Sequence, residues 1–315
     1  MDGVFLLGVW MVFGGNLSNL GVSYGFMGLF AEQEWGFMSN PLGRPTWFGI
    51  PLAGGALLIG LFGARTFSSQ GEAKTPAPPS SPVVVELFTS EGCSSCPPAD
   101  ALLAKLAERS PFGNAQVVAL EEHVDYWDDL GWRDPFSSHA LTTRQYSYAG
   151  VLGNGNPYTP QMVVDGTIEF SGGRAQQALE SIAEAAARRK TPVTMSQAQG
   201  TAGKAGTENF SVQVGRLTPS GKGGAAEVWL AITETGLHSS VTRGENAGQE
   251  LSHAAIVRAM RKIGEAKPDR DVSFSGDAAI PIRGEWKREN LKVVSFLQEK
   301  NSLRILGAAE ISLRP

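Results

Sequence analysis

The chain has few cysteines and little charge, and both scarcities limit what it can do. It contains 2 cysteines and 18% charged residues in 315 residues, and its net charge is -4. Two thiols are too few for a zinc site built from four cysteines, although they suffice for one disulfide. A net negative charge gives no reason to expect nucleic acid, which usually binds a clustered basic face. We therefore expect no nucleic-acid partner and take the two cysteines as the first candidates for chemistry.

Nucleotide-binding signatures are also missing. The sequence has no internal repeat, no G-x-G-x-x-G fingerprint and no phosphate-binding loop of the Walker type. We therefore expect no bound cofactor. We also expect no resident metal, because no methionine or further histidine lies near the cysteines. The length of 315 residues suggests about two domains, and the 42% of hydrophobic residues can fill substantial cores.

Positive charge is absent from the start of the chain, because no lysine or arginine precedes Arg44. A signal peptide normally begins with a positively charged segment, which residues 38–44 would supply before the uncharged stretch 47–64. We predict that Met38 is the true start and that residues 1–65 contain a signal or anchor region. An amino-terminal peptide mapping upstream of Met38 would refute this start. A cleaved signal and an inner-membrane tether through 47–64 both suit the length, and a buried hydrophobic hairpin is the alternative.

A proline-rich segment separates this region from the rest of the chain. Residues 66–82 lack apolar periodicity and contain Pro76, Pro78, Pro79 and Pro82, which predicts a stiff, extended linker. A hydrophobic segment, a linker and then folded residues are typical of exported proteins. We expect a periplasmic protein or one anchored in the inner membrane and facing the periplasm.

Both cysteines lie in the sequence Cys93-Ser94-Ser95-Cys96, between a strand and a helix. The strand is predicted from the apolar run Val83–Phe88. The helix is predicted from apolar residues spaced i, i+3, i+4, i+7 and i+8, namely Ala99, Leu102, Leu103, Leu106 and Ala107. Similar patterns predict the order β-α-β-α-β-β-α over residues 83–190, with a hairpin turn at Asp165-Gly166.

The C-x-x-C pair after the first strand, together with Thr159-Pro160 before a later strand, resembles the thioredoxin-like superfamily. The stretches Glu86–Asp100, His123–Asp128 and Tyr158–Gln161 are similar, more closely, to a bacterial exported family of unknown function with a thioredoxin-like half. This resemblance covers roughly residues 83–310 and implies no established substrate. It implies that Pro160 is cis and faces the cysteines, where it leaves backbone groups free for a substrate strand and excludes a metal ion.

Residues 191–315 show short alternating runs separated by glycine-rich and polar turns, which predict a β-sandwich. The segment 254–263 fits a helix or a strand, and we favour a strand. The fold class expected is thus an α/β thioredoxin-like domain at 83–190, followed by an all-β, sandwich-like domain at 191–315.

The expected chemistry is thiol–disulfide exchange with protein thiols or disulfides. Cys93 lies at the start of a helix, where free N–H groups and the helix dipole stabilise a thiolate. We expect Cys93 to be the exposed nucleophile and Cys96 to resolve the mixed disulfide, with Thr159 and Pro160 beside them. Ser94 and Ser95 are small and leave room for a partner.

Five further residues are candidates for supporting roles. They are Glu86 as a buried proton acceptor for Cys96, His123 as a proton shuttle, Asp125 as a weaker acid or base, and Tyr126 and Trp127 as a peptide-binding wall. The alternative for each is ordinary packing or exposure to solvent. Glu91 is expected to be solvated, and His139, His238 and His253 show no ligand spacing.

Two other functions stay open at this stage. One is an exported binding or structural protein with a permanent disulfide. The other is a copper-handling protein, since Cys93, Cys96 and His123 could ligate a soft metal.

Overall fold

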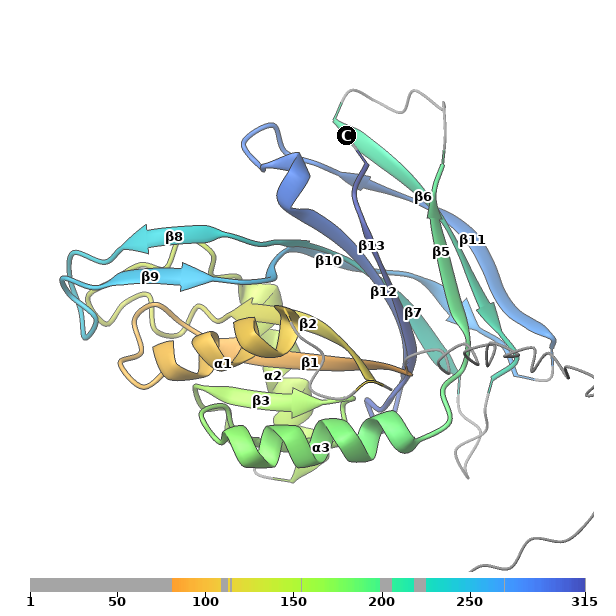
Figure 1. Cartoon of the computed structure of the whole chain (residues 1–315), viewed down its shortest axis with the longest axis horizontal. Helices are drawn as coiled ribbons and strands as arrows, with labels where there is room; N and C mark the ends of the chain where they lie inside the picture. Colours follow the sequence, from red (N-terminus) through yellow and green to blue (C-terminus); the bar gives the residue numbers. More distant parts are fainter. Residues whose placement is uncertain are drawn as a thin grey trace, which may run out of the picture. The chain divides into compact units, whose positions relative to one another are not determined.

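In a computed structural model of the chain, eight strands form one continuous mixed sheet (Figure 1). The structure describes residues 81–108, 113, 115–153, 155–198, 206–217, 225–268 and 270–314. The predicted signal or anchor region and all but the end of the predicted linker lie outside these residues. Among the helices of the described part, none has the length and apolar character needed to cross a membrane.

The first half of the described chain alternates strands and helices in the order expected from the sequence. Its elements are β1 Ser81–Thr89, α1 Pro97–Glu108, β2 Ala115–His123, α2 His139–Leu152, β3 Gln161–Val164, β4 Ile168–Ser171 and α3 Ala175–Ala187. β1 pairs with β2 in parallel and with β3 in antiparallel register. Val83, Val85 and Leu87 pack with α1 and α3, whereas Val84 packs on the other face with α2. Burial of both faces explains why the β1 sequence is continuously apolar.

The second half is almost entirely β-structure. Its elements are β5 Val193–Gln197, β6 Thr207–Gly215, β7 Ala226–Glu234, β8 Leu237–Ser240, β9 Glu250–His253, β10 Ile256–Ala266, β11 Val272–Pro281, the 3-10 helix Arg288–Asn290, β12 Leu291–Glu299 and β13 Ile305–Ser312. The strand favoured for 254–263 is confirmed, because β10 occupies most of it.

These strands do not form a separate domain, so the predicted fold class is wrong. The large sheet has the order β13-β12-β7-β10-β2-β1-β3-β4, and it therefore runs from one half of the chain into the other. The join is at β2, where Ile256 of β10 lies opposite Glu121 and the Glu121 N–H donates to the Ala255 carbonyl at 2.9 Å. β2 would otherwise be an open edge with unpaired backbone groups. A thioredoxin-like α/β domain followed by an independent β-sandwich does not describe this arrangement.

A second junction between the halves lies at the predicted Asp165-Gly166 turn. The Ile305 N–H donates to the Asp165 carbonyl at 2.8 Å. Gly166 has a φ of +63°, and a Cβ there would lie 2.0 Å from the Leu303 carbonyl oxygen. Only glycine fits both the turn and this close approach.

Two smaller β-elements complete the structure. The sheet β11-β6-β5 packs on β7 and β12 through Phe210, Val212, Leu230 and Val293. The β8–β9 hairpin projects from the large sheet and lies along α1 (Figure 1). Its connecting loop therefore reaches the start of α1, where the two cysteines are.

Candidate functional site

The two cysteines form a disulfide at the first turn of α1. The Cys93 N–H donates to the Ser90 carbonyl, and the Cys96 carbonyl accepts from Asp100 N–H, which starts the helix. Ser94 and Ser95 are exposed, but Cys93 is only 1% exposed and Cys96 is fully buried. The expectation that Cys93 is exposed is therefore wrong for this disulfide form.

The cover over the cysteines comes from the loop between β8 and β9. The side-chain amide of Asn246 donates to the Glu91 carbonyl at 2.8 Å and to the Cys93 carbonyl at 3.0 Å. The Glu245 carboxylate accepts from the Ser94 N–H at 3.0 Å and from its hydroxyl at 2.7 Å. We call residues 241–249 the cover loop. Nothing in the sequence links it to the cysteines, because about 150 residues separate Ser94 from Glu245.

Trp127 connects the cysteine turn to Thr159-Pro160. A Cβ on Gly92 would lie 3.3 Å from the Trp127 Cβ, so the turn and the tryptophan are in close contact. The Trp127 indole N–H donates to the Thr159 hydroxyl at 2.8 Å. The Thr159-Pro160 peptide bond is cis, as expected. The Trp127 side chain thus connects the cysteine turn with Thr159, so these predicted site residues lie together.

Five polar side chains are buried next to the cysteine turn, and we call them the histidine–carboxylate cluster. They are Glu91, Glu121, His123, Asp134 and His253, each less than 5% exposed. Glu121 Oε1 lies 2.7 Å from His253 Nδ1 and 3.3 Å from His123 Nε2. Asp134 Oδ2 lies 2.7 Å from His123 Nδ1, and Glu91 Oε1 lies 3.1 Å from His253 Nε2. The expectation that Glu91 is solvated is wrong. His253, which showed no ligand spacing in the sequence, lies within this cluster.

The carboxylates of the cluster keep both imidazoles protonated. Although burial lowers the pKa of His123, Asp134 and Glu121 raise it well above its usual value. Burial likewise lowers the pKa of His253, but hydrogen bonds to Glu121 and Glu91 raise it to about 9. Burial raises the pKa of Glu121, and its hydrogen bonds with the two histidines more than offset this and lower it. The cluster is therefore an internal ion network that joins β2 to β9.

Asp100, one helical turn after Cys96, is the buried acid nearest the cysteines along α1. It is 5% exposed, and its Oδ1 accepts from the Thr89 hydroxyl at 2.7 Å. Burial, followed by the charge of Glu121, raises the pKa of Asp100 to about 7. Its proton can thus be gained or lost near neutral pH.

Asp100→Asn is expected to change how stability depends on pH. The folded protein holds the Asp100 proton up to about pH 7, whereas an unfolded aspartate loses it near 3.8. As the pH rises from about 4 to about 7, the Asp100 carboxyl group therefore lowers the free energy of unfolding of the wild-type protein. The neutral amide of the variant has no such effect. The free energy of unfolding of the variant relative to wild type should rise by up to about 4 kcal/mol across this window, in urea titrations at several pH values. Asp129→Asn, at an exposed position, is the control, and an unchanged difference for Asp100→Asn would contradict the assignment.

Glu86 is buried as predicted, but it faces away from α1. Its carboxylate accepts from Arg144 Nε at 2.6 Å and from the Tyr148 hydroxyl at 2.5 Å, both on α2. Alternate residues of β1 point to opposite faces of the sheet, so Glu86 cannot share the α1 face with Val85 and Leu87. The geometry does not fit the predicted role of Glu86 as proton acceptor for Cys96. The buried acid one helical turn after Cys96 is Asp100, which the sequence pattern did not single out.

Asp125 and Tyr126 take part in packing around α2. Asp125 accepts from the Thr142 hydroxyl at 2.5 Å and lies 3.0 Å from His139 Nδ1. Tyr126 is half-buried beside Phe88, and burial raises the pKa of its hydroxyl to about 12. Within the part of the chain that the structure describes, no hydrogen bond joins Asp125 or Tyr126 to either cysteine.

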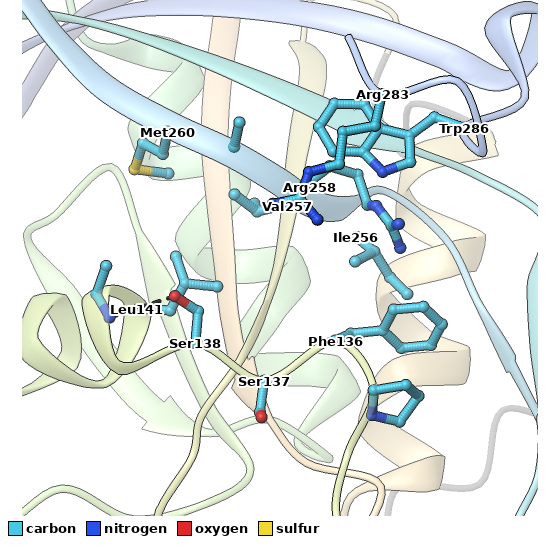
Figure 2. Close-up of a pocket in the computed structure, with 13 residues that line it drawn as sticks. Phe136, Ser137, Ser138, Leu141, Ile256, Val257, Arg258, Met260, Arg283 and Trp286 are labelled. Atoms are coloured by element: carbon cyan, nitrogen blue, oxygen red, sulfur yellow. Dashed lines mark hydrogen bonds between the residues drawn. The ribbon is translucent and has the colours of Figure 1, made fainter. Parts of the chain in front are cut away.

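A pocket of about 400 Å³ lies next to the histidine–carboxylate cluster. Figure 2 shows Phe136, Ser137 and Ser138 on one side of it and Arg258, Arg283 and Trp286 on the other. The Phe136 ring packs edge-on against both imidazoles, with centroids 5.5 Å from His123 and 5.6 Å from His253. The Phe136 ring therefore contacts both the cluster and the pocket.

The sequence reading missed Asp100, Glu121, Asp134, Asn246 and His253. Glu121 and Glu122 did carry a signal, because two carboxylates stand together at the end of an apolar strand run. Asn246 and His253 carried none, since only the pairing of β10 with β2 brings their segment to the site.

Comparison with known families and structures gives two informative matches. The profile of a family described as "Protein of unknown function (DUF1223)" matches residues 84–298. A crystal structure of a protein from Agrobacterium tumefaciens, determined by structural genomics, is 27% identical with a TM-score of 0.57; the match covers 76% of this chain and 97% of that one.

A weaker match is to a protein with a different description. A domain of the outer membrane lipoprotein Omp28 from Porphyromonas gingivalis is 10% identical with a TM-score of 0.27, over 40% of this chain and 90% of that one. A likeness at this level supports no argument. No curated protein matches the chain.

Proposed function

Since this chain belongs to the DUF1223 family of proteins of unknown function, we propose its function from its own site: thiol–disulfide exchange between the Cys93–Cys96 pair and a protein thiol. The observation that carries the proposal is the position of the disulfide at the first turn of α1, one turn before the buried Asp100. A helix start stabilises the thiolate that forms when the disulfide opens. A carboxyl group with a pKa of about 7 can exchange a proton with the Cys96 thiol near neutral pH.

The exchange has two steps. A thiolate of the partner attacks the Cys93 sulfur, which breaks the S–S bond and releases Cys96 as a thiolate that Asp100 can protonate. A second partner thiolate then attacks the partner's own sulfur in the mixed disulfide and releases Cys93. Two electrons pass from the partner dithiol to the Cys93–Cys96 disulfide, so the partner is oxidised. In the reverse route the Cys93 thiolate attacks a partner disulfide and Cys96 resolves the mixed disulfide, so the partner is reduced.

Access to Cys93 requires the cover loop to move. Asn246 and Glu245 hold this loop on the cysteine turn through hydrogen bonds, which a partner's groups can replace. Ser94 and Ser95 are already exposed, and the Ser95 hydroxyl lies 3.3 Å from the Cys93 sulfur. A partner that binds over these two serines in place of the Glu245 carboxylate would reach the disulfide.

A redox titration of the Cys93–Cys96 pair tests the proposal. We expect a potential above about -300 mV, because structural disulfides lie below that value and exchange-active ones above it. The oxidised fraction can be read by mass spectrometry after alkylation of free thiols in glutathione or dithiothreitol buffers. A potential below about -300 mV would contradict the proposed exchange reaction.

The burial of both cysteines favours a second candidate, a binding or structural protein with a permanent disulfide. The same titration separates the two functions. For either one we propose an exported location, where disulfides persist.

A further inference from the structure

The geometry of the histidine–carboxylate cluster points to a metal site separate from the cysteines: we propose that Glu121, His123 and His253 bind one divalent transition-metal ion. The ligand atoms offered by these three residues lie within 4.8 Å of one another. Two imidazole nitrogens and one carboxylate are a common ligand set for zinc and for non-haem iron.

Each candidate ligand side chain is also hydrogen-bonded to a second protein group, through the atom that does not face the proposed metal position. Asp134 contacts the far nitrogen of His123 at 2.7 Å, and Glu91 contacts the far nitrogen of His253 at 3.1 Å. Glu121 Oε2 accepts from the Ala254 N–H at 2.8 Å, which leaves Oε1 to face the imidazoles. Carboxylates on the outer nitrogen are the usual means by which proteins orient histidines toward a metal.

The supporting carboxylates are fixed in turn. Asp134 accepts from the Glu91 N–H and the Phe136 N–H, both at 2.8 Å. Glu91 accepts from the Trp132 indole at 2.7 Å. The ligand atoms therefore have little freedom to turn away from one another.

The charges of the cluster suit a divalent cation. Three carboxyl groups surround the two imidazoles, and each lies within 3.3 Å of a ring nitrogen; they belong to Glu91, Glu121 and Asp134. A divalent ion placed between the imidazoles would be offset by these carboxyl groups.

The spacing of the ligand atoms is close to that of a metal site. Ligands at about 2.0–2.1 Å from zinc in a tetrahedral arrangement lie roughly 3.3 Å apart. The distance from His123 Nε2 to Glu121 Oε1 is already 3.3 Å, and that from His253 Nδ1 is 2.7 Å and must widen by about 0.6 Å. The pocket of Figure 2 is the entry route we expect, because the Phe136 ring that lines it also packs against both imidazoles.

Cobalt(II) is the probe for this site, since its visible absorption reports coordination by protein ligands. Full-length protein is stripped with a chelator and titrated with Co²⁺, and Zn²⁺ is then added as competitor. We expect one Co²⁺ per chain, displacement by Zn²⁺, and a higher midpoint of thermal unfolding with either ion. His253→Gln and Glu121→Gln should abolish the absorption, and Asp134→Asn should weaken binding about 10–100-fold.

Two controls make the result specific. His238→Gln, at an exposed position of β8, and a Cys93→Ser/Cys96→Ser variant should bind as wild type does. Glu121→Gln keeps the size of the side chain, so it remains informative if a histidine variant fails to fold. Absence of stoichiometric binding to the folded wild-type protein overturns the proposal. So does binding that survives Glu121→Gln or that is lost in the cysteine variant.

Discussion

A Cys93→Ser variant is expected to lose disulfide exchange completely, and Cys96→Ser is expected to accumulate a mixed disulfide with its partner. Cys93 adjoins the exposed Ser94 and Ser95, whereas Cys96 is fully buried inside α1. The incoming thiolate therefore meets Cys93 first, and without its sulfur no bond can form. Without Cys96 the mixed disulfide has no internal thiol to resolve it.

Reduction of a test disulfide by the purified protein measures the first effect, and non-reducing electrophoresis with mass spectrometry measures the second. Ser94→Ala keeps both sulfurs and is the matched control, with activity expected at the wild-type level or above because a contact with Glu245 is removed. Exchange that persists in Cys93→Ser would exclude the mechanism.

The largest effect on stability is expected for Arg144→Met. Arg144 lies on α2 and is paired with Glu86 at 2.6 Å and with Glu122 at 3.6 Å, on β1 and β2. It also donates to Gln298 on β12, and its guanidinium lies over the rings of Trp229 and Phe296. Methionine keeps much of the packing but leaves the buried Glu86 without its cation. Loss of one partner of a buried pair costs about 3–5 kcal/mol, which urea unfolding should detect.

A double substitution separates charge from packing at this position. Adding Glu86→Gln to Arg144→Met removes the unpaired charge, so a large part of the stability should return. Arg188→Met, in a partly exposed pair with Glu184, should cost at most about 1 kcal/mol. A loss below about 1 kcal/mol for Arg144→Met would show that Glu86 is not held by this pair.

The local elements of the first half could be predicted because their signals are local. Apolar periodicity marked α1, the continuous apolar run marked β1, and Asp165-Gly166 marked the β3–β4 turn. The cysteine pair was likewise visible as a short sequence, and the resemblance to thioredoxin-like proteins implied the cis Thr159-Pro160 bond. The ambiguous segment 254–263 was correctly taken as a strand because neighbouring runs alternate.

The predictions that were wrong share one cause: they depend on which distant segments of the chain pair with each other. Periodicity shows that a strand exists and which face is buried, but it does not show which strand lies at its edge. Both β2 and β10 were found, yet their pairing, which makes one sheet of two expected domains, was not. The side to which Glu86 points also depended on where α2 packs.

The residue pattern alone therefore predicted a strand–turn–helix with a C-x-x-C pair and a β-rich second half, and the resemblance added the cis proline. No local pattern shows that the second half continues the first sheet or that its β8–β9 hairpin is hydrogen-bonded to the cysteine turn; both follow from contacts between distant segments. The same pairing carries His253 to Glu121 and His123, which are about 130 residues away in the chain. Such contacts follow from which backbone edges and buried charges find partners, and that is settled only when the whole chain folds.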